Sequence, residues 1–182
     1  KLPFTFPVRL EDNSAHALGE YPGTDKVAYN EGIFVGYRWH DKEQLKPLFA
    51  FGHGLSYTTF AYGEPTITGG ASNADGTFAE TDTVRAEITL TNTGERKGTE
   101  VAQLYIGDIV TSYSWTDREL KAFQRVELEP GETKTVGFDI PVSECTIVDS
   151  DANRIVEPGE FEVLIGHSSR RRDLKRTTFT VA

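Results

Sequence analysis

The sequence lacks methionine altogether and contains a single cysteine, Cys145, among its 182 residues. With one cysteine, the chain can form neither an internal disulfide nor a thiolate metal cage. No apolar run approaches the ~18–20 residues that cross a bilayer, so we expect no membrane-spanning helix. Residues 1–7 carry no export signal. Because methionine is missing even at position 1, we expect a piece of a longer, processed polypeptide.

Positive charge is also scarce, since 19 Lys and Arg face 28 Asp and Glu, for a formal net charge of −9. This balance argues against broad binding to nucleic acid. One basic run, His167–Arg176, holds five of the 19 basic residues but contains no aromatic side chain. It lies between two strand-like segments, so we expect a solvated loop at the end of a sheet. The lone cysteine is compatible with cytoplasmic, periplasmic and secreted proteins, which leaves the localisation open.

Aromatic residues gather in the first third of the chain, where residues 1–62 hold 12 of the 20. This part shows neither a sustained helical stripe nor a series of alternating strands. Aromatic side chains bury large areas, and 62 residues with so little regular pattern can hardly enclose that many. The sequence therefore predicts two parts: an extended, aromatic-rich linker over residues 1–62, which packs onto a larger body, and a domain over residues 63–182.

Residues 63–182 show the alternation of short strands and turns that is typical of an all-β domain. Apolar residues alternate with polar ones over Val84–Leu90, Val136–Ile140 and Phe161–Ile165, as in half-buried strands. Turn clusters separate such segments, for example Gly69–Gly76 and Glu157–Glu160. About seven strands at regular spacing are typical of a mainly β, two-sheet sandwich of the immunoglobulin or fibronectin type III kind.

Isolated patterns that resemble catalytic motifs have simpler interpretations. The segment Gly52–Ser56 lacks the Gly-x-Ser-x-Gly spacing of a nucleophile elbow, and its paired glycines indicate a tight backbone turn. The four histidines (His16, His40, His53 and His167) are scattered, with no metal-binding spacing.

Two carboxylates, Glu31 and Asp41, are flanked by aromatic side chains that could shift a pKa by desolvation. A pair of carboxylates would suit glycoside chemistry. The simpler hypothesis is that these two residues hold Arg38 or the backbone. No second signal supports catalysis.

Several motifs, taken in order, resemble one family closely. In the first part they are LPFTFP (2–7), YNEGIFVGYRW (29–39) and PLFAFGHGLSYTTF (47–60). In the second part they are TNTG (91–94), GTEVAQLY (98–105), RELKAF (118–123), LEPGE (128–132) and GHSS (166–169). Together they resemble the C-terminal portion of glycoside hydrolase family 3 β-glucosidases: the end of an α/β-sandwich domain, a linker and a fibronectin type III-like domain. RLEDN (9–13) is further similar to members with a protective-antigen-like insert. Ala122 stands where family members usually have glycine.

The resemblance implies a partner rather than a site. Family 3 enzymes are retaining, with a nucleophilic Asp on an N-terminal barrel and an acid/base Glu in the second domain. Both precede residue 1 in the family's order, so the resemblance implies no catalytic, cofactor-binding or metal-binding residue in this chain, and no cofactor. Its partners would be the upstream barrel and α/β-sandwich domains, which bind the β-glucoside. The chain would brace these domains and be inactive alone.

Two other hypotheses remain open at this point. The chain could be a free-standing carbohydrate-binding module that uses Trp39, Tyr113 and Trp115 as sugar-stacking platforms. It could also be an interaction domain of an unrelated surface protein, but that hypothesis leaves the motif at 52–60 unexplained.

Overall fold

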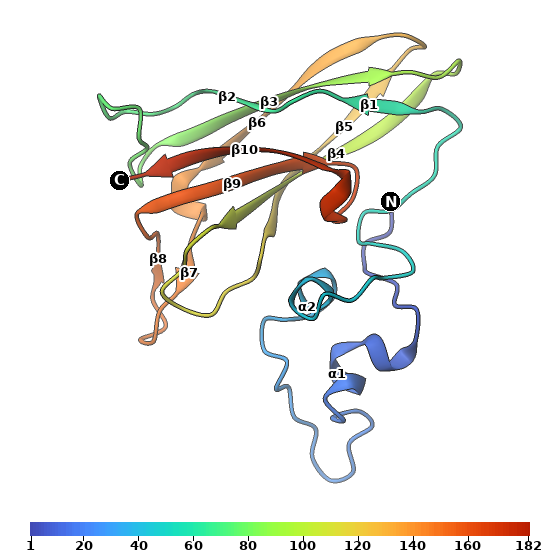
Figure 1. Ribbon diagram of the computed structural model, residues 1–182, viewed down its shortest axis with the longest axis vertical. Coiled ribbons are helices and arrows are strands. Elements are labelled where there is room, and N and C mark those ends of the chain that lie inside the picture. Colours follow the sequence, from blue (N-terminus) through green and yellow to red (C-terminus); the bar gives the residue numbers. More distant parts are fainter.

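The structure, a computed structural model, describes residues 1–182. It consists of a β-sandwich that begins at Phe60 and a largely irregular segment before it (Figure 1). We call this segment, residues 1–59, the leader. No helix in the structure combines the length and the apolar character needed to cross a membrane.

The first sheet has β3 at its centre, and all its strands pair in antiparallel fashion. β6 lies along one edge of β3, while β1 and β2 follow one another along the other edge. The strands are β1 (Phe60–Tyr62), β2 (Thr66–Gly69), β3 (Thr83–Asn92) and β6 (Thr133–Pro141). The alternating pattern predicted β3 and β6, but it missed β2 because that strand is short and three of its four residues are exposed.

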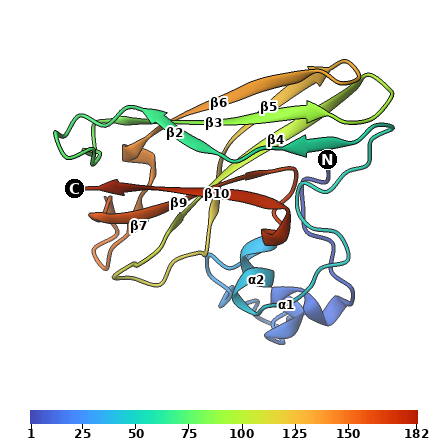
Figure 2. The ribbon, with the colours of Figure 1, turned by 45° about the horizontal axis from the view of Figure 1, so that its top comes forward.

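The second sheet has the strand order β10-β9-β4-β5, again antiparallel throughout. Its strands are β4 (Gly98–Asp108), β5 (Glu119–Leu128), β9 (Gly159–Gly166) and β10 (Leu174–Val181). A two-stranded hairpin of β7 (Ile147–Val148) and β8 (Arg154–Ile155) follows the 3₁₀ turn Val142–Glu144. Figure 2 shows the two sheets as layers, with β3 and β6 over β9 and β10.

The core lies between the sheets and consists of 19 buried side chains. The inward residues are those that the alternation predicted, because every second side chain of a strand points to the same face. Val84, Ala86, Ile88 and Leu90 of β3 are all buried, as are Phe161, Val163 and Ile165 of β9. The predicted two-sheet sandwich is thus confirmed.

The outer face of the second sheet is covered as well, which the alternation did not predict. Gln103 and Tyr105 of β4 and Glu162 and Leu164 of β9 are buried although they point away from the core. The ring of Tyr105 meets that of Tyr37 edge-on at 5.9 Å, so the leader supplies part of this cover. Both faces of the second sheet are therefore covered: one packs against the core, and the leader packs against part of the other.

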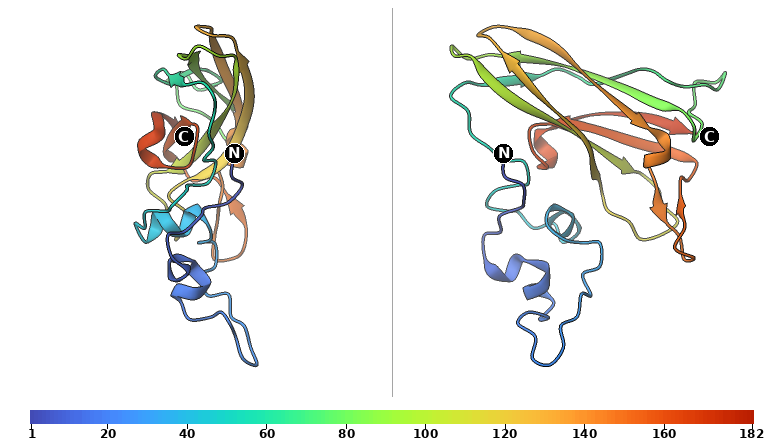
Figure 3. Two further views of the ribbon diagram at one scale, coloured as in Figure 1. Left: turned by 90° about the vertical axis from the view of Figure 1, so that its right-hand side faces the viewer. Right: turned by 180° about the vertical axis from the view of Figure 1, so that it is seen from behind.

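The leader has little regular structure. Its helical pieces are a 3₁₀ turn (Leu10–Asp12), α1 (Ser14–Ala17) and α2 (Tyr37–Lys42). Its two ends pair with each other: the N–H of Leu2 donates to the carbonyl of His53 at 2.7 Å, and Phe6 pairs with Phe49. We call these paired ends the base of the leader. From the base the leader extends away from the sandwich (Figure 3).

The predicted boundary between residues 62 and 63 remains a prediction. In the structure, β1 (Phe60–Tyr62) already pairs with Leu90–Asn92 of β3, and its partly buried ends pack against the core.

Candidate functional site: the junction of the leader and the sandwich

Arg118 is the centre of the junction between the leader and the sandwich. It directly precedes β5 and is 1 % exposed. One terminal nitrogen, Nη2, donates to Asp41 Oδ1 at 2.8 Å and to the carbonyl oxygen of Ser169 at 2.7 Å, while Nη1 donates to Asp117 Oδ2 at 2.5 Å. A planar guanidinium presents several donors in fixed directions. Arg118 therefore joins α2 of the leader, the segment before β5 and the loop between β9 and β10.

Other bonds surround this centre. Arg38 of α2 forms an ion pair with Glu119 at 3.0 Å, and the hydroxyl of Tyr37 accepts the N–H of Leu120 at 3.1 Å. At the base of the leader, Lys1 Nζ lies 2.7 Å from Glu100 Oε1. These contacts bond the leader to β4 and β5.

The hypothesis that Asp41 holds Arg38 is therefore wrong. Although both residues lie on α2, Arg38 pairs with Glu119 and Asp41 pairs with Arg118. Glu31 is half-buried, and its Oε2 has no hydrogen-bond partner in the structure. Sequence reasoning missed Arg118, because nothing in the motif RELKAF shows that its first residue is buried.

The segment Gly52–Ser56 forms the tight turn that its glycines predicted. Gly52 has a φ of +78°, and the N–H of His53 donates to the carbonyl of Ala50 at 3.0 Å. A Cβ on Gly52 would clash with the side-chain amide of Gln103 on β4, so glycine is favoured here by this close approach as well as by its positive φ. In the structure, no group of three or more His, Cys, Asp or Glu side chains is placed to hold a metal ion.

The expectation for the basic run His167–Arg176 is right in its position and partly right in its exposure. Residues 167–173 connect β9 and β10, and Arg171 and Arg172 are exposed there, but Ser168 and Ser169 are buried. The N–H of Ser169 donates to the carbonyl of Phe51 at 2.8 Å. Arg171 is held by Asp117 at 2.8 Å and by Glu162 at 3.1 Å.

The aromatic residues of the carbohydrate-binding hypothesis do not form one surface. Trp39 is 6 % exposed, and its Nε1 donates to the carbonyl of Asp12 at 3.1 Å inside the leader. Its ring face is therefore closed to a sugar. Trp115 is half-buried beside Cys145 and Ile147, and Tyr113 is exposed.

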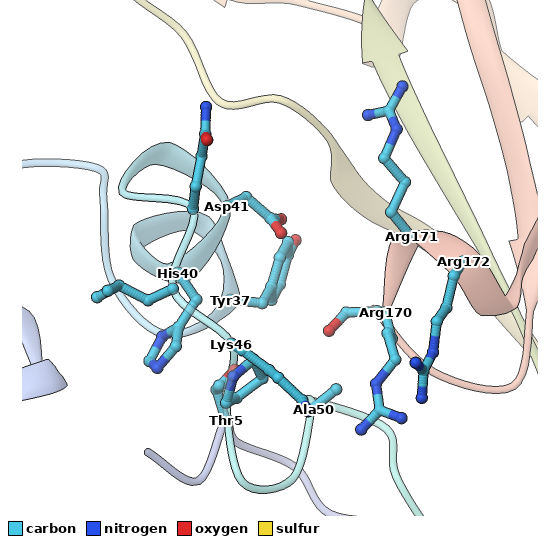
Figure 4. Close-up of a pocket in the computed structure, with 13 residues that line it drawn as sticks. Thr5, Tyr37, His40, Asp41, Lys46, Ala50, Arg170, Arg171 and Arg172 are labelled. Carbon is cyan, nitrogen blue, oxygen red and sulfur yellow. The ribbon is translucent and has the colours of Figure 1, made fainter. Parts of the chain in front are cut away.

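A cavity of about 310 Å³ lies beside Arg118, between the leader and the β9–β10 loop. Figure 4 shows Asp41 and Tyr37 of α2 on one side and Arg170, Arg171 and Arg172 on the other. Thr5 and His40 also contribute to its walls. Thr5 Oγ1 and His40 Nε2 are buried, and neither has a hydrogen-bond partner in the structure.

Asp41 differs from an ordinary carboxylate. Burial raises its pKa to about 6, although the neighbouring Arg118 and Arg171 act in the opposite direction and Asp117 adds to the rise. Because the folded pKa lies above the ordinary 3.8, folding favours the protonated form. The resulting stabilisation is full below about pH 3.8 and is lost as the pH rises through about 6.

We expect Asp41→Asn to flatten the pH dependence of stability in this window, because the amide keeps the shape of the side chain and does not titrate. The free energy of unfolding, measured by urea denaturation at several pH values between about 4 and 7, should fall with rising pH less in the variant than in the parent. Asp151→Asn is the control, since Asp151 is exposed and its side chain makes no hydrogen bond in the structure. Parallel pH profiles for Asp41→Asn and the parent would contradict the assignment.

Comparison with known proteins identifies the class of the sandwich. Residues 100–169 match the family described as the fibronectin type III-like domain. The chain is 43 % identical over 173 residues to β-glucosidase BoGH3A of Bacteroides ovatus, an alignment that covers 93 % of this chain and 22 % of that protein.

Solved structures agree with these matches. β-Glucosidase 3B of Thermotoga neapolitana is 38 % identical, with a TM-score of 0.85 over 100 % of this chain and 24 % of that one. A β-glucosidase involved in saponin metabolism from intestinal bacteria is 87 % identical, with a TM-score of 0.74 over 75 % of this chain and 18 % of that one.

The chain spans less than a quarter of the length of the curated relatives it matches. The resemblance found in the sequence is confirmed: the chain corresponds to the C-terminal portion of glycoside hydrolase family 3 β-glucosidases, including their fibronectin type III-like domain.

Proposed function

We propose that this chain is the structural C-terminal segment of a retaining β-glucosidase, that it braces the catalytic domains, and that it is inactive alone. The observation that carries the proposal is the exposed apolar surface of the leader. Of the 19 large hydrophobic side chains that are exposed, 14 lie in residues 1–59. An apolar surface of this extent marks an interface, and the upstream part of the enzyme is the partner that the family order supplies.

The ion pairs of the junction support the same proposal. Because Arg118 and Arg38 bind the leader to the sandwich, the sandwich holds the apolar surface of the leader in a fixed orientation. Retaining hydrolysis needs two carboxyl groups about 5–5.5 Å apart. A displacement near 1 Å can cost about 10²-fold in rate, so a segment far from the reacting atoms can affect catalysis by positioning the domains that carry them.

The test removes residues 60–182 from the longer enzyme. We expect the melting temperature and kcat on an aryl β-glucoside to fall together, because the leader is then no longer anchored. Exposed Phe123→Ala in the longer enzyme is the control for a change confined to the sandwich surface. A truncated enzyme with unchanged melting temperature and turnover would refute the bracing role, and turnover by the separated 182-residue chain would refute its inactivity.

The natural substrate of the longer enzyme belongs to the same proposal. The similarity of this chain to a β-glucosidase involved in saponin metabolism, at 87 % identity, makes saponin β-glucosides the first natural substrates to test.

A further inference from the structure

The cavity at the junction has walls rich in hydrogen-bond donors and positive charge. We propose that it binds an oxyanion, a carboxylate or phosphate group, through Arg170, Arg172, Lys46 and the hydroxyl group of Thr5. This site is separate from the apolar surface of the leader, so the proposal stands independently of the bracing role.

The first argument is the charge that the protein leaves uncompensated. Lys46 makes no ion pair in the structure, although it contributes to the cavity wall. Arg170 and Arg172 share one carboxylate, that of Asp173, at 3.9 and 3.7 Å, which exceeds hydrogen-bond length. In a chain with a net charge of −9, a cavity with this excess of positive charge is an exception, and it attracts anions.

The other charged groups of the cavity are already engaged. Asp41 accepts from Arg118, so the one carboxylate in the walls does not neutralise Arg170 or Arg172. Arg171 is held by Asp117 and Glu162. Figure 4 agrees with this division: Arg170 and Arg172 extend toward the side where Thr5 and Ala50 lie, while Arg171 points the opposite way.

The second argument is the polarity of the buried groups. Thr5 is 9 % exposed and its Oγ1 has no partner, which leaves its O–H free to donate. Leaving a buried polar group without a partner is unfavourable, and an oxyanion accepts the hydrogen bond that the Thr5 hydroxyl can donate.

His40 adds a condition on the ligand. Its Nδ1 lies 3.0 Å from the carbonyl oxygen of Gly36, and a carbonyl only accepts, so Nδ1 carries the proton. The buried, unpartnered Nε2 is therefore an acceptor in neutral His40 and a donor in the cation. Hydrogen phosphate satisfies both states, because it has oxyanion acceptors and one O–H, whereas a carboxylate satisfies only the cation. The cavity has room for it, since about 310 Å³ corresponds to roughly ten water molecules.

Inorganic phosphate is the probe, titrated into the 182-residue chain by calorimetry at constant ionic strength. We expect saturable binding that Arg170→Ala and Arg172→Ala each weaken about tenfold or more, as the loss of a hydrogen bond to a charged group predicts. Arg125→Ala is the matched control: Arg125 is exposed on β5 and makes no ion pair in the structure, so its removal should leave the affinity unchanged.

Thr5→Val separates binding from folding. The valine keeps the shape of threonine and removes a hydroxyl that has no partner, so without phosphate the variant should unfold at the same or a higher urea concentration. With phosphate it should bind more weakly than the parent. No saturable binding, or binding that Arg170→Ala, Arg172→Ala and Thr5→Val leave unchanged, would overturn the proposal.

The same titration with the longer enzyme identifies the source of the oxyanion. Phosphate binding by both proteins would assign the site to a free anion. Binding by the 182-residue chain alone would assign it to a carboxylate side chain of the upstream part, which occupies the cavity in the longer enzyme. Both results uphold the oxyanion site.

Discussion

Replacing Arg118 by alanine should lower the free energy of unfolding by about 3–5 kcal/mol, the loss expected when one partner of a buried ion pair is removed. Arg118 is almost fully buried, and its terminal nitrogens donate to Asp41, Asp117 and the carbonyl of Ser169. Alanine leaves the buried carbonyl and the largely buried carboxylate of Asp41 without this donor. Urea denaturation followed by circular dichroism measures the change.

The controls for this prediction use other residues of the same chain. Arg125→Ala removes an exposed arginine and should change the free energy of unfolding by no more than about 0.5 kcal/mol. The double variant Arg118→Ala/Asp41→Ala should lose less free energy of unfolding than the sum of the losses in the two single variants. The reason is that Asp41→Ala removes the carboxylate that Arg118→Ala leaves unpaired. A loss below about 1 kcal/mol for Arg118→Ala would show that the junction contributes no more than a surface ion pair.

The second large effect is expected at Phe161 in β9. Its ring stacks on that of Phe179 at 5.3 Å, and Phe179 in turn meets Phe78 at 5.4 Å, so three aromatic rings fill one end of the core. Phe161→Ala leaves a cavity between the sheets and should cost about 3–5 kcal/mol. Thermal and urea unfolding of the variant give the value.

Phe123 provides the matched control, since it is the same residue type in a strand but is 67 % exposed. Phe123→Ala should lower the free energy of unfolding by less than about 1 kcal/mol, because folding removes little of the apolar area of this ring from water. Equal losses for Phe161→Ala and Phe123→Ala would mean that the aromatic cluster does not stabilise the sandwich.

The contrast between these residues shows which parts of the fold were predictable. Period-two alternation correctly placed Val84–Leu90, Val136–Ile140 and Phe161–Ile165 with one face toward the core. The alternation is sufficient to predict the orientation of a strand where one of its faces is buried and the other is exposed to solvent. It fails for Tyr105 and Leu164, which lie on the outer face of their sheet and are nevertheless buried. Their burial depends on contacts with distant parts of the chain, which a local pattern does not show.

The junction could not be predicted for the same reason. Asp41 and Arg118 are 77 positions apart in the chain, and their pairing depends on how α2 docks beside β5. The sequence singled out Asp41 for its aromatic neighbours, but it gave the carboxylate the wrong partner. The cavity combines Thr5, Lys46 and Arg170 from three distant segments, so only the folded chain brings its donors together.

The paired base of the leader has a consequence for its tip. Since Leu2 pairs with His53 and Phe6 with Phe49, the residues between them form a closed loop whose ends are fixed on the sandwich. The entropy of closing such a loop changes slowly with length, and doubling a flexible loop costs only about 0.6 kcal/mol. Differences in length can therefore accumulate at the tip, while the base must keep the spacing that holds Lys1 against Glu100 and Gly52 against Gln103.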